Sequence, residues 1–339
     1  MHGLSKLFPI YRTHSNDLAK PRDTGRLRRW KYPRVMATLR IGYLGPEGSF
    51  SHEAVSIMEN VEPVACESIA DLLSAVADSS LDRGLVPLEN AIEGTVSATI
   101  DGLVFDHELV IVQEIVIPIR LHLLARPDVA MEDVSSVRSY VHALAQCRVF
   151  LHGLDVAIEQ TTSTSQAARE VSESSEPWAA VASSLAGELF GLVALATDIE
   201  DHPDNATRFV VVGRERVAAP TGHDRTTIVC FQDADRPGSL YGILGRFAAR
   251  DINLTKLESR PTKRGLGEYC FVIEFEGHVA DGVVADCLAD LQAHLARVKF
   301  LGSYPVTGEG AVDRRAEIDQ ARTSAFEWIN AIRARVRSS

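Results

Sequence analysis

The sequence has few of the features that mark a disulfide-stabilised, metal-binding or membrane-spanning protein. Its 339 residues include five cysteines, which are odd in number, scattered and never spaced as CxxC. Neither a disulfide framework nor a zinc site is therefore predicted. No stretch approaches the roughly 20 consecutive apolar residues of a membrane span. We expect a protein of a reducing cytoplasm that does not act in a membrane.

An excess of positive charge is also missing. The net charge of −11 argues against nucleic acid or an anionic membrane surface as a partner. The N-terminus is the exception, because residues 1–35 hold nine basic residues against two acidic ones. This segment has no continuous apolar run of a secretory signal and only weakly resembles a transit peptide. We expect a disordered extension there, since Met36 directly precedes the first strand-like run.

The composition is that of a folded protein, with 45% hydrophobic and 24% charged residues, and the length suggests two domains. From Thr38 on, short apolar runs alternate with helical patterns, which predicts an α/β fold. Residues 108–125 are a long strand-rich stretch that could carry the chain between two lobes. After the linker-like residues 217–224 the order becomes strand, helix, two strands, helix, strand. That order is typical of a ferredoxin-like unit.

Apolar residues recur at helical spacing near the C-terminus, so we expect one amphipathic helix there, packed on the core or on a partner subunit. The chain thus divides into four parts. They are an N-terminal extension (1–37), a two-lobed α/β domain (38–216), a ferredoxin-like domain (225–305) and a C-terminal helix and tail (306–339).

Two turns that follow strands carry candidate binding groups. GPEGSFS at 45–51 lacks the Walker Lys-Ser/Thr pair and the GxGxxG spacing, so it is either a tight turn or a carboxylate site built from backbone N–H groups. VPLENAIEGTV at 86–96 places Glu89 and Asn90 at a strand end. Ligands bind at strand ends in open α/β sheets, although a capped turn is the alternative.

Two further junctions are rich in hydroxyl and amide groups. SYVHALAQCR at 139–148 places Ser139 at a strand end and Gln146 one turn into a helix, and TTSTSQAA occupies 161–168. Taken alone, such residues are more often helix caps than ligands. His142 has no partner at metal-ligand spacing, and Ser139 lacks the GxSxG context of a nucleophile, so we expect neither a metal nor acyl-enzyme chemistry.

The motifs GPEGSFS, VPLENAIEG, ALAQCR, TTSTSQAA, IEDHPDNATRF and LESRP stand in the order and spacing of the bacterial prephenate dehydratases. From about residue 40 to 305 the chain resembles a monofunctional member of that family. The resemblance implies a catalytic domain of two lobes, like type II periplasmic binding proteins, with the active site in the cleft, and a C-terminal ACT domain. It also implies that prephenate is converted to phenylpyruvate, CO2 and water without a metal or redox cofactor, under feedback control by L-phenylalanine.

The resemblance assigns roles to individual residues. The catalytic candidates match the family's Thr-Arg-Phe, Ser/Gln and Glu-Asn positions and are Thr207, Ser139, Gln146, Glu89 and Asn90. The substrate-binding candidates are Arg208, Phe209, Gly48, Ser49, Thr162, Ser163 and Thr164. For Arg208, a contact with a substrate carboxylate and a salt bridge that steadies the lobes remain alternatives.

DRPGSLYGIL at 235–244 and NLTKLESRP at 253–261 match the two phenylalanine-binding motifs of dehydratase ACT domains, where the effector lies between paired ACT domains. The effector-binding candidates are Pro237, Gly238, Ser239, Leu240, Asn253, Leu254, Glu258, Ser259, Arg260 and Pro261. Because this site would span two subunits, we expect a homodimer or homotetramer.

The sequence departs from the family pattern in two places. Ala91 stands where Ser is usual after Glu-Asn, and Tyr140, Val141 and His142 replace His-Pro-Gln. Both changes concern substrate preference, so arogenate dehydratase, which performs the same reaction on the amino analogue, is the nearest alternative. A non-catalytic amino-acid sensor is an alternative of another class, and the intact Thr207 argues against it.

Overall fold

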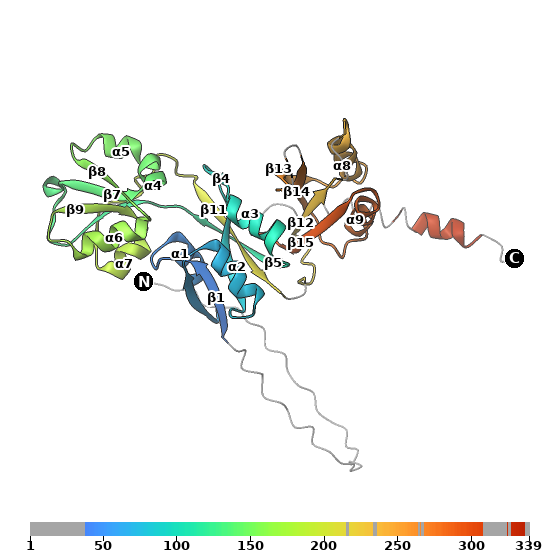
Figure 1. Ribbon diagram of the computed structural model, residues 1–339, viewed down its shortest axis with the longest axis horizontal. Coiled ribbons are helices and arrows are strands. Elements are labelled where there is room, and N and C mark those ends of the chain that lie inside the picture. The colour runs from blue at the N-terminus through green and yellow to red at the C-terminus, as the bar shows by residue number, and fades with distance from the viewer. Residues whose placement is uncertain are drawn as a thin grey trace, which may run out of the picture. The chain divides into compact units, whose positions relative to one another are not determined.

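The computed structural model describes residues 38–214, 217–232, 236–263, 265, 268–307, 324 and 327–335 (Figure 1). The predicted N-terminal extension lies outside these residues, as does most of the predicted C-terminal helix. Residues 327–333 of that helix are helical, and Trp328 is 66% exposed. No helix in the described part of the chain is long and apolar enough to cross a bilayer.

The first lobe is built on a sheet of order β2-β1-β3-β11-β5, with the short strand β4 paired to β3. Strand β1 is parallel to β2 and β3, whereas β11 is antiparallel to β3 and β5. The strands are β1 (Leu39–Leu44), β2 (Val61–Cys66), β3 (Arg83–Asn90), β4 (Gly94–Thr95), β5 (Val110–Pro118) and β11 (Ala206–Gly213).

Serine caps begin two helices of this lobe, α1 (Phe50–Ser56) and α2 (Ile69–Ala77). The Ser49 side chain accepts a hydrogen bond from the His52 N–H, and Ser68 accepts one from the Asp71 N–H. Each cap satisfies a helix N–H group that lacks an intrahelical partner. A short helix α3 (Ser97–Asp101) runs directly into a π-helical turn, η1 (Gly102–Asp106).

The second lobe has a sheet of order β10-β6-β9-β7-β8, in which β7 is parallel to β8 and β9. Its strands are β6 (His122–Ala125), β7 (Ser136–Tyr140), β8 (Ala157–Thr161), β9 (Trp178–Ala182) and β10 (Val193–Ala196). Its helical segments are η2 (Met131–Asp133), α4 (Val141–Gln146), α5 (Arg148–His152), α6 (Thr164–Glu173) and α7 (Ser184–Phe190).

Two helices of this lobe end at defined points. The helical stretch after β7 is divided at Cys147 into α4 and α5. Helix α7 ends at Phe190, because Gly191 adopts a left-handed conformation (φ 65°), and the chain then continues as β10. The chain passes between the lobes twice, through residues 119–121 and 197–205, which confirms the two-lobed architecture and the role expected for 108–125.

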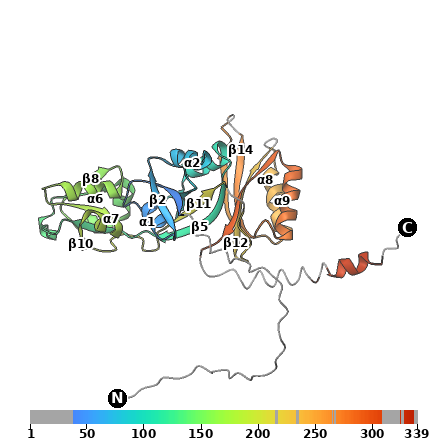
Figure 2. The ribbon, with the colours of Figure 1, turned by 90° about the horizontal axis from the view of Figure 1, so that it is seen from below.

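The third sheet has the order β13-β14-β12-β15 and is antiparallel throughout, as predicted for a ferredoxin-like unit. Helices α8 and α9 pack on one face of it (Figure 2). The other face shares a buried core with the first lobe, in which Val210 and Val212 of β11 lie with Val229 and Val272. The elements are β12 (Asp224–Phe231), α8 (Ser239–Ala248), β13 (Leu254–Pro261), β14 (Tyr269–Glu276), α9 (Gly282–His294) and β15 (Arg297–Pro305).

Candidate active site

The carboxyl ends of parallel strands from both lobes meet at the turn after β1. The hydroxyl of Ser165, at the start of α6, donates to the carbonyl oxygen of Glu47, and Ser183 Oγ, before α7, donates to the Gly48 carbonyl at 3.1 Å. A Cβ on Gly48 would lie 2.8 Å from Ser165 Oγ, and φ is +79°. Glycine therefore permits the close approach of the lobes at this end of the cleft.

A polar pair lies on adjacent strands of the first lobe, where Thr207 of β11 is opposite Asn90 of β3. Asn90 Oδ1 accepts hydrogen bonds from the N–H groups of Ile92 (2.9 Å) and Glu93 (3.0 Å), which fixes the orientation of the amide. Asn90 Nδ2 donates to Thr207 Oγ1 at 2.9 Å. Because an amide nitrogen can only donate, this bond leaves the proton of the Thr207 hydroxyl available for another acceptor.

The hydrogen bonds continue from the first lobe to the second lobe. Asn90 Nδ2 also donates to Asn205 Oδ1 (3.0 Å), and Asn205 Nδ2 donates to Gln146 Oε1 of α4 (2.9 Å). Gln146 Nε2 then donates to Glu93 Oε1 (3.4 Å), and His142 Nδ1 lies 2.9 Å from Glu93 Oε2. The hydrogen bond from His142 lowers the pKa of Glu93. The amide nitrogens of Asn90, Asn205 and Gln146 each have an acceptor, so the oxygen of the Thr207 hydroxyl is held in one place.

This arrangement gives the cleft a neutral hydrogen-bond donor of fixed position. The Thr207 residue is 9% exposed, so its hydroxyl lies at the edge of the core. A hydroxyl cannot supply a full proton near neutral pH, but it can donate a hydrogen bond that strengthens as an oxygen nearby gains charge. The geometry suits the departure of an oxygen leaving group. The Thr207 hydroxyl can assist that departure through its hydrogen bond alone.

Ser139 and Phe209 are among the predicted site residues that are not brought to this network. Ser139 is fully buried, and its hydroxyl donates to the Val181 carbonyl oxygen at 2.6 Å. Phe209 is 1% exposed and packs in the core between the first-lobe sheet and α1. A contact of Phe209 with substrate, as the sequence suggested, would require the core to open, so the ring supports β11 instead.

Arg208 and Glu89 point away from Thr207 and Asn90. Their side chains form an ion pair (Nη2 to Oε2, 2.9 Å), and Arg208 also contacts Glu114 and Glu274. Both terminal nitrogens of the guanidinium are thus held by carboxylates of the protein. The geometry favours the salt-bridge alternative for Arg208, with the difference that the bridge leads to the ferredoxin-like domain and not to the second lobe.

The hydroxyl-rich turns act as helix caps. Ser49 Oγ accepts from the His52 N–H at 3.2 Å, and Ser163 Oγ accepts from the Gln166 N–H at 3.0 Å at the start of α6. Thr162 is exposed, and Thr164 is the first residue of α6. The Ser49 and Ser163 hydroxyls are therefore occupied, and the start of α6 can offer backbone N–H groups to an anion.

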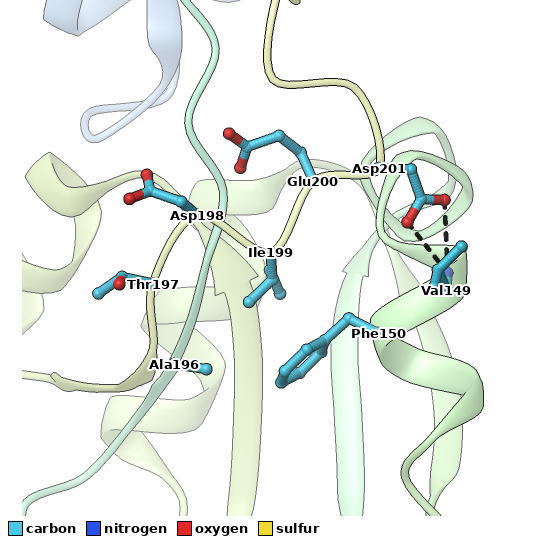
Figure 3. A pocket seen from close by; sticks show the side chains of 8 residues that line it. All are labelled: Val149, Phe150, Ala196, Thr197, Asp198, Ile199, Glu200 and Asp201. Carbon is cyan, nitrogen blue, oxygen red and sulfur yellow. Dashed lines mark hydrogen bonds between the residues drawn. The ribbon is translucent and has the colours of Figure 1, made fainter.

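A separate hollow of about 390 Å³ lies beside the second crossover (Figure 3). Asp198, Glu200 and Asp201 are among its lining residues. Asp201 accepts from the Val149 N–H, and Glu200 accepts from the Leu121 N–H and from Arg120. Asp201 thus holds this crossover to α5 and Glu200 holds it to the first crossover, and the carboxylates would repel an anionic ligand.

Three members of the network were missed by the sequence analysis: Asn205, Glu93 and His142. A signal for Asn205 was present, because it stands two residues before Thr207, and residues two apart in an extended chain share a face. Glu93 and His142 come from different lobes, and nothing in their sequence spacing indicates that they meet.

The predicted effector residues lie at the start of α8 and along β13. Gly238 is the N-cap of α8 with φ 86°, and no atom lies within 4 Å of a Cβ built on it. Glu258 accepts a hydrogen bond from Thr95 Oγ1 (2.7 Å), and Arg260 is paired with Asp101. Both contacts lead to the first lobe. The remaining candidates lie in the turn before α8, in α8 and on or beside β13: Pro237, Ser239, Leu240, Asn253, Leu254, Ser259 and Pro261.

Two α/β lobes joined by two crossovers, with a polar network across the cleft, define a protein that encloses a small molecule. The ferredoxin-like domain joined to the first lobe is typical of a regulated enzyme rather than a transport protein. Comparisons with known proteins agree. The family model described as prephenate dehydratase matches residues 41–217, and the ACT domain model matches residues 226–292. The chain belongs to the prephenate dehydratase family.

Individual relatives cover nearly the whole described chain. A prephenate dehydratase of Amycolatopsis methanolica is 39% identical over 86% of this chain and 97% of its own. A crystal structure of prephenate dehydratase from Arthrobacter aurescens, in complex with L-Phe, is 36% identical with a TM-score of 0.78, and covers 87% of this chain and 99% of its own. A structure described as a novel type of quorum quenching acylase is 29% identical with a TM-score of 0.73, covering 79% and 98%.

Proposed function

We propose that this protein is the enzyme that converts prephenate to phenylpyruvate, CO2 and water in the biosynthesis of L-phenylalanine. The observation that carries the proposal is the Thr207 hydroxyl, whose oxygen accepts from Asn90 and whose proton is thereby free to point at a leaving group. Family membership over both domains supports it. The reaction belongs in the cytoplasm, where the five unpaired cysteines would stay reduced.

The reaction breaks two bonds and makes the ring aromatic. The C–C bond to the ring carboxylate breaks, its electrons move through the ring, and the C–O bond at the opposite carbon breaks. The leaving oxygen departs as hydroxide and takes a proton to become water. Aromatisation drives the step, so the enzyme contributes position and a donor for the departing oxygen. We assign the donor role to Thr207 and the placement of Thr207 to Asn90, Asn205 and Gln146.

The substrate carries two carboxylates that need partners. Arg208 is held by three protein carboxylates, so we assign one substrate carboxylate to the backbone N–H groups at the start of α6. The turn at 45–49 and the cap residues Ser49 and Ser163 shape this end of the cleft.

The purified protein should convert prephenate to phenylpyruvate, and it should convert arogenate to phenylalanine more slowly, since the relatives are prephenate dehydratases. Product identification by chromatography with each substrate at equal concentration checks this. Faster turnover of arogenate would make the arogenate dehydratase alternative correct. Binding of either substrate without any product would point to the sensor alternative.

An acylase activity, as described for one structural relative, is not supported by the geometry. Ser139 lies three residues before His142, but it is buried and donates to a backbone carbonyl oxygen, while His142 is paired with Glu93. Neither residue is in a position to form an acyl-enzyme with the other.

We also propose that L-phenylalanine binds at the turn before α8 and along β13, and that the site is completed by a second ACT domain in a homodimer or homotetramer. The relative solved with L-Phe supports the ligand. The left-handed Gly238 opens the backbone N–H groups of the turn to a carboxylate, and Leu240 is half-buried beside them. Because biosynthetic end products commonly act back on their pathway, we expect inhibition.

Replacing Gly238 by valine should remove the response to L-phenylalanine while leaving basal turnover close to normal. The reason is conformational, since a β-branched residue is strained at φ 86° and would reshape the turn. The measurement is an L-phenylalanine titration of dehydratase activity. Gly222→Val is a matched control, because Gly222 has φ 88° and equally open surroundings but lies in the linker. Loss of the response in both variants, or in neither, would contradict a site at Gly238.

A further inference from the structure

Thr207 and Asn90, which we call the catalytic pair, have chain neighbours that contact the ACT domain. Successive side chains of a strand point to opposite faces of its sheet. On β11, Phe209 and Val211 lie in the core with α1, whereas Val210 and Val212 lie in the core shared with the ACT sheet. Thr207 belongs to the first set and Arg208 to the second. The residue that contacts the ACT sheet is therefore the direct neighbour of Thr207, the residue to which we assign the hydrogen bond to substrate.

A β-bulge gives β3 the same two-faced arrangement. Arg208 is paired with Glu89, but Phe209 is paired with Pro87, so Leu88 is the extra residue. A bulge changes the direction of the side chains beside it. As a result Leu88 is buried in the shared core and Glu89 also turns to the ACT side, while Asn90 remains beside Thr207. Both members of the catalytic pair thus have a charged neighbour that faces the ACT sheet.

These two charged neighbours are each held by the ACT sheet. Arg208 Nη2 lies 3.0 Å from Glu274 Oε1 and 2.9 Å from Glu274 Oε2. Glu89 Oε1 lies 3.1 Å from Lys256 Nζ, while its other oxygen contacts Arg208. Glu274 is on β14 and is 2% exposed, and Lys256 is on β13. Two ion pairs therefore join β13 and β14 to β3 and β11, with Glu89 and Arg208 paired in the middle. The Arg208–Glu274 pair is largely buried, whereas the Glu89 side chain is 37% exposed.

The ion pairs favour the charged forms of Arg208 and Glu89. Burial alone would lower the pKa of Arg208, but the carboxylates of Glu274 and Glu114 outweigh it and raise the pKa above its ordinary value. Burial would raise the pKa of Glu89, and Lys256 and Arg208 outweigh it and lower the pKa. Removal of one partner of Arg208 therefore leaves a buried charge uncompensated.

The strand that supplies Lys256 also carries the predicted effector residues. Lys256, Glu258 and Arg260 alternate along β13 and all face the first lobe, where they contact Glu89, Thr95 and Asp101. Ser259 between them is exposed. A ligand that moves β13 would therefore also move Lys256, the partner of Glu89, because Lys256 is part of the same strand.

We propose that Arg208 and Glu89 are positioning residues, through which the ACT sheet sets the placement of the Thr207–Asn90 pair by way of Glu274 and Lys256. The regulatory half of this proposal rests on L-phenylalanine being the effector. The other half concerns the basal reaction and holds without any effector.

The test compares Glu274→Gln with Glu108→Gln in the full chain. Glutamine keeps the size of Glu274 but removes the charge that holds Arg208. Glu108 also forms ion pairs between the first lobe and the ACT domain, with Arg297 and Lys299 of β15, but it does not touch β3 or β11. Glu274→Gln should lower kcat by roughly 2- to 30-fold with less than a twofold change in KM, and weaken L-phenylalanine inhibition by a similar factor. Glu108→Gln should leave kcat and the inhibition unchanged.

Hydrogen exchange supplies a readout that does not depend on activity. Backbone N–H groups in peptides that contain residues 205–208 and 88–90 should exchange faster in Glu274→Gln than in the wild type, and unchanged in Glu108→Gln. Lys256→Met, which removes the ion pair between Lys256 and Glu89, should have the same effects as Glu274→Gln. Wild-type kcat and wild-type exchange in folded Glu274→Gln protein would overturn the proposal.

The two ways of failing can be told apart. If the wild type turns over prephenate but ignores L-phenylalanine, the effector proposal is wrong, and kcat and exchange of Glu274→Gln still decide the positioning role. If the wild type shows no dehydratase activity, the proposed function is wrong. In that case exchange at 205–208 decides whether the ACT sheet holds β11.

Discussion

Thr207→Val should lower kcat by roughly 100- to 1,000-fold, which is the usual cost of losing one hydrogen-bond donor aimed at developing charge. Valine keeps the branched shape of threonine and removes the hydroxyl. KM should change little, because the hydrogen bond to the departing oxygen is strongest in the transition state. Initial rates of phenylpyruvate formation over a range of prephenate concentrations measure both constants.

The contacts around Thr207 indicate that this variant will fold. Asn90 Nδ2 would lose Thr207 Oγ1 but would keep Asn205 Oδ1 at 3.0 Å and the Ala206 carbonyl oxygen at 3.3 Å. Its donors therefore remain satisfied. Thr207→Ser provides the matched control, since it retains the hydroxyl and should retain most of kcat. If Thr207→Val turned over at a near-normal rate, or if serine failed as badly as valine, the donor role would be wrong.

The sequence predicts some residues of this site and not others, because some of its signals are local and others depend on tertiary structure. The alternation of strands and helices predicted both lobes and the ferredoxin-like domain because hydrophobic periodicity is a local property. Thr207, Asn90 and Gln146 were named through the resemblance of short motifs. Strand alternation places Thr207 and Arg208 on opposite faces of β11, so the two side chains cannot both face one substrate.

The remaining contacts depend on tertiary structure. The bulge at Leu88 turns Glu89 away from the cleft, and a single extra residue leaves no mark in an apolar strand pattern. The partners of Arg208 lie 94 and 66 residues away at Glu114 and Glu274. An isolated glutamate in an apolar strand could equally be exposed at a sheet edge. Glu274 is buried because the ACT sheet packs against the sheet of the first lobe.

The close approach of those two sheets predicts the largest effect on stability. Gly302 of β15 crosses β5, and a Cβ built on it would lie 2.3 Å from the Ile111 carbonyl oxygen and 3.0 Å from the Ile111 nitrogen. Both are backbone atoms of a central part of the fold and cannot turn away as a side chain could. Gly302 also has φ +145°, a conformation that L-residues rarely adopt.

Gly302→Ala should therefore separate β15 from β5 and destabilise the folded chain by about 2–6 kcal/mol, as the sum of overpacking and backbone strain. Thermal unfolding followed by circular dichroism should show a melting temperature lower by roughly 5–20 °C. Gly245→Ala in α8 is the control of opposite sign, because nothing lies within 4 Å of its Cβ and alanine is the better helix former. An unchanged melting temperature of Gly302→Ala would mean that the ACT sheet does not pack on β5 in this way. The ion pairs of Arg208 and Glu89 depend on that packing, so Gly302→Ala should also reduce kcat at temperatures where the protein is still folded.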